Sequence, residues 1–285
     1  MNLSNNSKGV LLAFLGTITL SPDSLLIRLI GSDMWTTTFL RSIFVGLSLL
    51  IFMLVIYRGQ TLQQFKQMDR YAFLIILFIS GTNFFFVASI QNTSVAHTLI
   101  IVGAAPVVSA ILGLIFLGEK VSRQTWLTIV VVMISLFFVV YDNQQSSLTG
   151  DLYAVIVLLL WSSVFIFGRL TRANNTLAAM CVSGFISASW TFPMTELSSL
   201  DFRQLAQGLL LGCLVAAALS QITMAPRYIP AAEVAVFMPM ETVFGAFLVW
   251  LFIGEYPGLV SIIAGSIMIL AIMISSFYQL KRSSS

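Results

Sequence analysis

Long apolar runs separated by short polar connections make up most of this chain. A stretch of about 20 apolar residues is long enough to cross the hydrocarbon core of a bilayer as a helix. By that criterion the sequence predicts ten membrane-spanning helices, at residues 9–29, 36–57, 71–91, 95–117, 123–141, 151–170, 177–195, 204–223, 231–253 and 257–279. The pattern therefore predicts an all-α membrane protein with short connections.

Composition agrees with the apolar pattern. Hydrophobic residues make up 58% of the chain and charged residues 9%, and the mean hydropathy is +0.98. A soluble domain carries about 25% charged residues, so this chain is predicted to face lipid. The absence of basic runs argues against a nucleic-acid partner. Cys181 and Cys213 lie in apolar runs without C-x-x-C spacing, which is typical of buried structural cysteines.

Lysine and arginine are distributed unevenly over the predicted connections. If the chain starts inside, the inner segments hold eleven of these residues, and the outer loops hold two, Arg28 and Arg203. Inner loops of membrane proteins carry the excess of basic residues. A single lysine, Lys8, precedes the first apolar run, and no cleavage site follows it, which indicates an uncleaved first helix. Both termini are therefore predicted to be cytoplasmic.

The sequence repeats itself at an offset of 136 residues. Over positions 96–120 this offset gives seven identities, and the pair Gly118–Glu119 falls on Gly254–Glu255 at the end of a helix in both halves. Most of the other identities are weak, because leucine, valine and alanine coincide easily in apolar segments. Two halves of five helices are predicted, and because five is odd the second half enters the membrane inverted. Inverted repeats are typical of secondary transporters.

The repeat also predicts the domain boundaries. The first five-helix repeat is expected at residues 1–141 and the second at 151–285. A polar segment at 142–150 would join them as a periplasmic linker.

Ten apolar helices in two halves, with a "FLGE"-like end to the fourth helix of each half, resemble the EamA branch of the drug/metabolite transporter superfamily. Arg41, in "TTFLRSIFVG", is similar to an arginine that this branch often carries in its second helix. The resemblance implies a ten-helix carrier of the bacterial inner membrane, commonly an exporter of amino acids or other small metabolites. Glu241 lies unusually deep for this pattern, and no motif fixes a substrate.

Glu241 is the most informative ionisable residue. It lies near the middle of the ninth predicted helix, and its repeat mate is Ala105, so the repeat does not require a carboxylate there. An ionisable group inside a span costs roughly 2.5–3.5 kcal/mol on insertion scales, so it needs a partner or a function. Glu241 is predicted to bind a substrate amine or to carry a coupling proton. The alternative is a structural acid that a neighbouring hydroxyl or arginine satisfies.

Asp23 and Arg41 are predicted at similar depth in the first and second helices. A structural ion pair is the simpler interpretation, and a gate or an arginine that binds a carboxylate is the alternative. Pro22 precedes Asp23 and is expected to kink or break the first helix beside a cavity.

Further polar and aromatic residues are predicted near the middle of the membrane. Asn83, Trp161, Ser162 and Gln221 are predicted to join Glu241 in a substrate site. His97, the one histidine, is predicted at the start of the fourth helix as an interfacial residue, with a proton relay as the alternative, and it is a candidate for a gate or an ion pair. One imidazole without a second ligand nearby in sequence does not indicate a metal site.

The two Gly-Glu pairs are expected to build structural turns. Glycine suits the left-handed residue that ends a helix, and a carboxylate suits the start of the next one. Gly118 with Glu119, and Gly254 with Glu255, would then each form a tight helix hairpin at a membrane surface.

These features together predict a secondary-active transporter that exports small amphipathic metabolites such as amino acids by alternating access, with the proton as a candidate coupling ion. An uncoupled facilitator or channel for small solutes is the alternative. An intramembrane enzyme is more remote, because the sequence has neither G-x-S-x-G nor H-E-x-x-H. No cofactor or metal is expected. The expected partners are the lipid bilayer and a small-molecule substrate, and a homodimer is left open.

Overall fold

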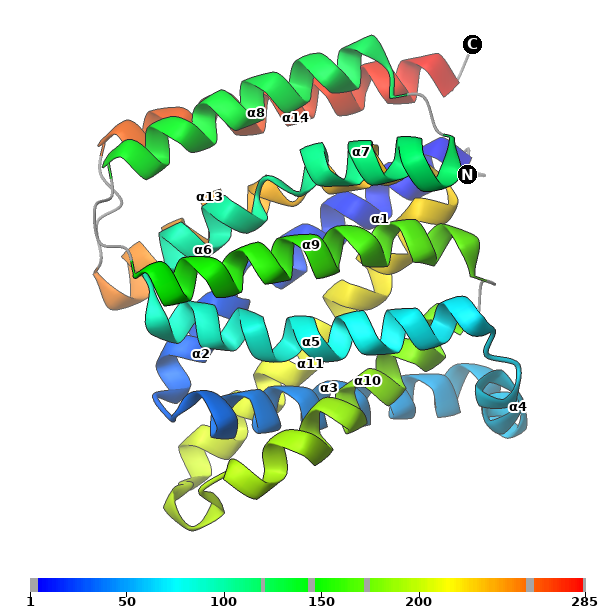
Figure 1. The fold of residues 1–285 in the computed structure, drawn as a ribbon, viewed down its shortest axis with the longest axis vertical. Helices are drawn as coiled ribbons and strands as arrows, with labels where there is room; N and C mark the ends of the chain where they lie inside the picture. Colours follow the sequence, from blue (N-terminus) through cyan, green and yellow to red (C-terminus); the bar gives the residue numbers. More distant parts are fainter. Residues whose placement is uncertain (1–4, 119–120, 143–146, 172–174, 255–258, 284–285) are drawn as a thin grey trace.

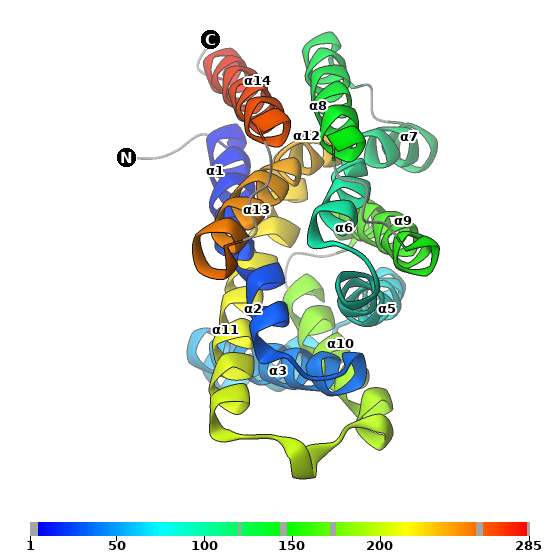
Figure 2. The same cartoon turned by 90° about the vertical axis from the view of Figure 1, so that its left-hand side faces the viewer.

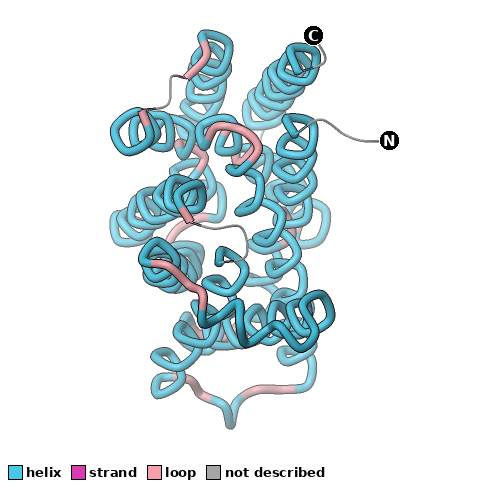
Figure 3. Tube along the Cα trace, turned by 90° about the vertical axis from the view of Figure 1, so that its right-hand side faces the viewer, coloured by secondary structure: helices cyan, strands magenta, loops and turns pink. Residues whose placement is uncertain are grey.

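The computed structural model describes residues 5–118, 121–142, 147–171, 175–254 and 259–283. These residues form helices joined by short loops and turns, and no strand occurs among them (Figure 3). The elements in chain order are α1 (Asn5–Leu20), α2 (Asp23–Ile30), α3 (Met34–Tyr57), η1 (Arg58–Gln60), α4 (Thr61–Lys66), α5 (Arg70–Asn92), α6 (Val95–Val102), α7 (Ala105–Leu117), α8 (Arg123–Asp142), α9 (Leu148–Leu170), α10 (Asn175–Thr191), η2 (Phe192–Met194), η3 (Leu197–Ser199), α11 (Phe202–Met224), η4 (Ala225–Arg227), α12 (Ala231–Ala235), α13 (Pro239–Ile253) and α14 (Leu259–Ser283).

Most of the predicted spans are present at full length. Among the described residues, eight helical segments are long and apolar enough to cross a membrane: Asn5–Ile30, Met34–Lys66, Arg70–Asn92, His97–Leu117, Leu148–Leu170, Thr176–Met194, Phe202–Arg227 and Ala231–Ile253. Two shorter apolar segments, Arg123–Phe138 and Ile262–Ser275, lie where the fifth and tenth spans were predicted. The all-helical membrane fold is therefore confirmed, and the count of ten spans stays a prediction.

Three of the long segments are interrupted along the span, between two shorter helices. α1 and α2 are separated at Ser21–Pro22, α6 and α7 at Gly103–Ala104, and α12 and α13 at residues 236–238. Proline lies in the first turn of α7 and of α13, where its missing N–H leaves no hydrogen bond unmade. Interrupted helices are tolerated at membrane depth only where protein or a cavity surrounds the free backbone. The three interruptions therefore point to the interior of the bundle.

Helices from the two predicted halves pack against each other throughout. α5 lies along α9, α3 packs against α10 and α11, and α1 packs against α11. α8 and α14 lie side by side at one edge of the molecule, and α3 and α10 lie toward the opposite one (Figures 1 and 2). Close contact between α3 and α10 depends on Gly184, because a Cβ there would come within 2.8 Å of Gly46 N and Ser42 O.

Two helices end in glycines with positive φ. Gly118, after α7, has φ 64°, and Gly254, after α13, has φ 84°. This left-handed conformation favours glycine because it has no Cβ. Glu119 and Glu255 lie outside the described residues, so the role of their carboxylates in the turns stays a prediction. Residues 143–146 of the expected linker lie outside them as well.

Candidate functional site

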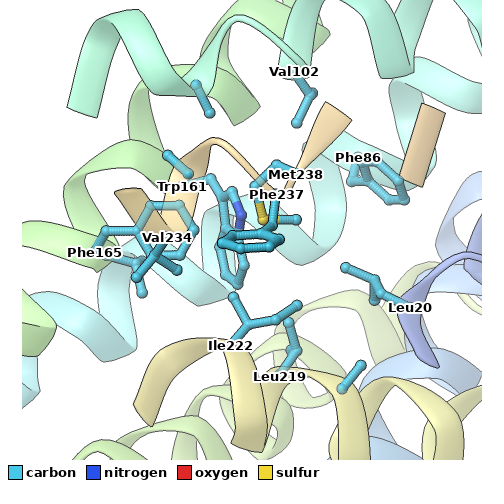
Figure 4. Packing of buried hydrophobic residues seen from close by; sticks show 14 of the residues in the cluster. Leu20, Phe86, Val102, Trp161, Phe165, Leu219, Ile222, Val234, Phe237 and Met238 are labelled. Atoms are coloured by element: carbon cyan, nitrogen blue, oxygen red, sulfur yellow. The ribbon is translucent and has the colours of Figure 1, made fainter. Parts of the chain in front are cut away.

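Charged, polar and apolar side chains line a cavity with an empty volume of about 420 Å³. It is lined by Leu20, Asp23, Arg41, Ile79, Thr82, Asn83, Phe86, Val102, Val157, Trp161, Leu219 and Glu241. These residues come from α1, α2, α3, α5, α6, α9, α11 and α13, so both predicted halves contribute. The apolar lining residues labelled in Figure 4 belong to the buried hydrophobic cluster of the protein.

Asp23 and Arg41 form a buried ion pair on one wall of the cavity. The guanidinium donates from Nε to Asp23 Oδ1 at 3.1 Å and from Nη2 to Asp23 Oδ2 at 2.7 Å. The two residues are only 2% and 4% exposed. A bidentate geometry is the strongest arrangement of an arginine and a carboxylate, and it lowers the cost of burying either charge.

Asn83 extends this pair into a hydrogen-bonded chain. Arg41 Nη1 donates to Asn83 Oδ1 at 2.6 Å, and Asn83 Nδ2 donates to Ser187 Oγ at 3.2 Å. Ser187 Oγ in turn donates to the carbonyl oxygen of Ser80 at 3.4 Å. The chain connects α2, α3 and α5 to α10, and it fixes the orientation of the guanidinium toward Asp23.

Glu241 lies in the cavity without the partners that Asp23 has. Its side chain is buried, with 5% exposure, and no described residue makes a hydrogen bond to its Oε1. Almost every buried polar atom in a folded protein has a partner, so an exception needs an explanation such as a ligand or a proton.

Both cavity carboxylates stand at the start of a helix that follows an interruption. Asp23 is in the first turn of α2, and Glu241 is in the first turn of α13. The N-terminus of a helix carries a partial positive charge that favours an anionic side chain. The interruptions thus supply part of the environment that allows two carboxyl groups to be buried in the membrane-spanning region.

A hydrogen bond joins two of the interrupted segments. Thr242 Oγ1, on α13, donates to the carbonyl oxygen of Leu99, on α6, at 3.1 Å. Gly245 lies one turn further along α13, and a Cβ there would be 3.2 Å from Leu99 Cδ1 and 3.3 Å from Ser24 Oγ. α13 therefore packs closely against both α6 and α2, and its first turn is held beside the cavity.

Five of the predicted site residues line the cavity: Asp23, Arg41, Asn83, Trp161 and Glu241. The predicted pairing of Asp23 with Arg41 is present. Whether any of these residues binds a substrate stays a prediction.

Three other predicted residues do not line the cavity. Ser162 follows Trp161 on α9, and successive side chains of a helix point about 100° apart. The amide Nε2 of Gln221 bonds to Ala217 O of its own helix at 3.0 Å. His97 Nδ1 lies 3.6 Å from Asp151 Oδ1, at the start of α6. His97, a candidate for an ion pair, thus connects α6 to α9, and the substrate roles of Ser162 and Gln221 stay predictions.

Other lining residues were not predicted. Ile79 and Phe86 lie four residues before and three residues after Asn83 on α5, and Thr82 lies three residues after Ile79, so helical periodicity around Asn83 was an available signal. Ser187 was missed because α10 is rich in small polar residues and none of them stands out in the sequence.

Comparison with known proteins agrees with the fold. Residues 7–141 and 148–277 each match the model of a family described as the EamA-like transporter family. A solved crystal structure of another protein superposes with a TM-score of 0.78 at 13% identity, covering 98% of this chain and 99% of that one. This likeness supports the fold alone. No curated protein sequence matches the chain.

Proposed function

Since the chain belongs to the EamA-like transporter family, we propose that it is a secondary-active transporter whose substrate site is the cavity lined by Glu241. The two matched segments are the two repeats of a multi-pass integral membrane protein. The observation that carries the proposal is the buried Glu241 carboxyl group, whose Oε1 has no partner among the described residues. A buried carboxyl group of this kind beside a cavity suits the binding of a substrate or of a proton. Membership of a transporter family suggests that this binding serves transport.

Alternating access is the proposed mechanism. In this proposal ten spans form two inverted halves of five, and it is supported by a cavity that residues from both family-matched segments line. The interruptions in three spans give short helical segments that can reorient while the long helices stay packed. Discontinuous helices around a central site occur in many secondary transporters.

Proton exchange is the proposed coupling. A proton and the ammonium group of a substrate would bind to Glu241 alternately. The ionised carboxylate pairs with an ammonium, and the protonated carboxyl group has no charge with which to do so. The substrates are small amphipathic metabolites such as amino acids, exported across a bacterial inner membrane with both termini of the carrier in the cytoplasm. The apolar lining, with Trp161 and Phe86, supports a substrate with a hydrophobic body.

The test uses the purified full chain in sealed proteoliposomes. Amino acids, amines and nucleoside-like metabolites are first screened by thermal shift, and those that stabilise the protein are assayed for flux with and without an imposed pH gradient. The proposal predicts accumulation against the substrate gradient when the pH gradient is present. Flux that only equilibrates the substrate, whatever the pH gradient, indicates the alternative of an uncoupled facilitator or channel. Absence of protein-dependent flux for every stabilising compound overturns the proposal.

A further inference from the structure

The charged groups of the cavity suggest which substrates fit it. Asp23, Arg41 and Glu241 are the charged residues of the lining. Their formal charges sum to −1 when Glu241 is ionised and to 0 when it is protonated. In neither state does the lining carry a net positive charge that would attract an anion.

The one cation of the lining is already occupied. Arg41 uses Nε and Nη2 to hold Asp23 and Nη1 to hold Asn83, so three of its five N–H donors are engaged. Its guanidinium also lies 5.8 Å from the centroid of the Phe86 ring. A substrate carboxylate would have to displace Asp23 from a bidentate pair that is tethered in place and buried. The carboxylate of a zwitterion therefore has no vacant cationic partner in this cavity.

An ammonium group, by contrast, meets acceptors that have no partner. Glu241 Oε1 and Thr82 Oγ1 are both buried oxygen atoms to which no described residue hydrogen-bonds. An ammonium has three N–H donors and pairs favourably with a carboxylate. The ring of Trp161 offers a further surface that attracts a cation or packs against an apolar body.

We infer that this cavity selects small lipophilic amines and amine derivatives whose carboxylate is absent or esterified, and discriminates against zwitterionic amino acids. The inference rests on the proposed function and narrows its substrate class: among small amphipathic metabolites it favours amines and replaces the zwitterionic amino acids named there as the example. Glu241 takes the ammonium, the apolar and aromatic lining takes the hydrophobic body, and the Asp23–Arg41 pair excludes the carboxylate.

Four compounds that share a phenyl ring on a short chain and differ in their charged groups test the inference on the purified full-length protein. Phenethylamine and phenylalanine methyl ester carry an ammonium alone, phenylalanine is a zwitterion, and phenylpropionate is an anion. Calorimetric titration of each should show that the two cations bind at least roughly ten-fold more tightly than phenylalanine, and that phenylpropionate does not bind. Equal or tighter binding of phenylalanine overturns the inference and leaves the transport proposal standing. Preference for phenylpropionate overturns both the inference and the proposed substrate site at Glu241. Failure of all four compounds to bind overturns the inference, and the flux assay then decides separately whether the protein is a transporter.

A variant sharpens the test. In Asp23→Asn the guanidinium of Arg41 loses its carboxylate, so the affinity for phenylalanine should rise roughly ten-fold while that for the methyl ester stays the same or falls. Asp201→Asn is the matched control, because Asp201 caps α11 and is exposed, away from the cavity, and the four affinities should not change. If the affinity for phenylalanine does not rise in Asp23→Asn, the pairing of Arg41 with Asp23 is not what keeps the substrate carboxylate out, and the inference fails. The wild-type panel remains decisive if Asp23→Asn does not fold.

Discussion

The Arg41 guanidinium and the Asp23 carboxylate form two hydrogen bonds, of 3.1 and 2.7 Å, with both residues buried in the membrane-spanning region. Asp23 belongs to α2, which starts after an interruption, and Arg41 belongs to the long helix α3. The pair fixes one wall of the cavity and leaves Glu241 as the lining carboxyl group that is outside the pair.

Removal of either charge should therefore be costly. Asp23→Asn leaves the Arg41 guanidinium buried without its counter-charge, and Arg41→Met leaves the Asp23 carboxylate buried without its counter-charge. Each substitution should lower the free energy of unfolding by roughly 3–5 kcal/mol. Thermal unfolding in detergent measures the effect. The double swap Asp23→Arg with Arg41→Asp should lose less than the sum of the two single changes. If both single variants unfold at the wild-type temperature, the pair has no structural weight.

The contact of α13 with α6 predicts a smaller effect. Thr242→Val removes the hydrogen bond to Leu99 O and should lower the free energy of unfolding by about 1 kcal/mol. Thr19→Val is the matched control, because Thr19 Oγ1 bonds to Leu15 O within its own helix. Equal unfolding temperatures for the two variants would show that the link between α13 and α6 contributes nothing.

Helix contact at Gly184 predicts a steric effect. In Gly184→Ala the new methyl group would approach Gly46 N and Ser42 O within 2.8 Å, and neither backbone atom can rotate away. Overpacking of this kind costs about 1–3 kcal/mol, measured by thermal unfolding. Gly59→Ala is the control, since no heavy atom lies within 4 Å of a Cβ there. A Gly184→Ala protein as stable as Gly59→Ala would contradict the close packing of α3 and α10.

Proposed topology predicts a labelling pattern. After Cys181 and Cys213 are replaced, single cysteines are introduced at Gln145 and at Lys66. A membrane-impermeant thiol reagent should label the cysteine at 145 from outside intact cells, and the one at 66 only after the membrane is opened. Labelling of both from outside, or of neither before lysis, would contradict the predicted orientation.

Much of this architecture was accessible from the sequence, because a membrane imposes simple rules on length and polarity. Apolar runs predicted the helices, and Pro22 predicted an interruption that the structure contains. The ion pair was predictable since two opposite charges at similar depth in adjacent helices favour pairing.

Other features depend on rotations of helices that the apolar pattern does not fix. Trp161 lines the cavity and its neighbour Ser162 does not, although each is a plausible cavity residue by sequence. The hydrogen bond from Arg41 to Asn83 joins two residues that are 42 positions apart in the chain, and no sequence pattern in α3 or α5 predicts it. The cavity itself follows only from the packing of helices from both halves.

The most direct test of the central claim is the movement of protons with substrate in proteoliposomes that contain either the wild-type protein or Glu241→Gln. A transported amine should drive protons across the membrane through the wild-type carrier, and its flux should vary with pH. Glutamine keeps the shape of the side chain, but it neither releases a proton nor carries the negative charge that forms an ion pair with an ammonium. The account predicts that Glu241→Gln, correctly inserted and of wild-type thermal stability, moves no protons and retains no pH dependence of flux. Unchanged flux, pH dependence and proton movement in that variant would contradict the account.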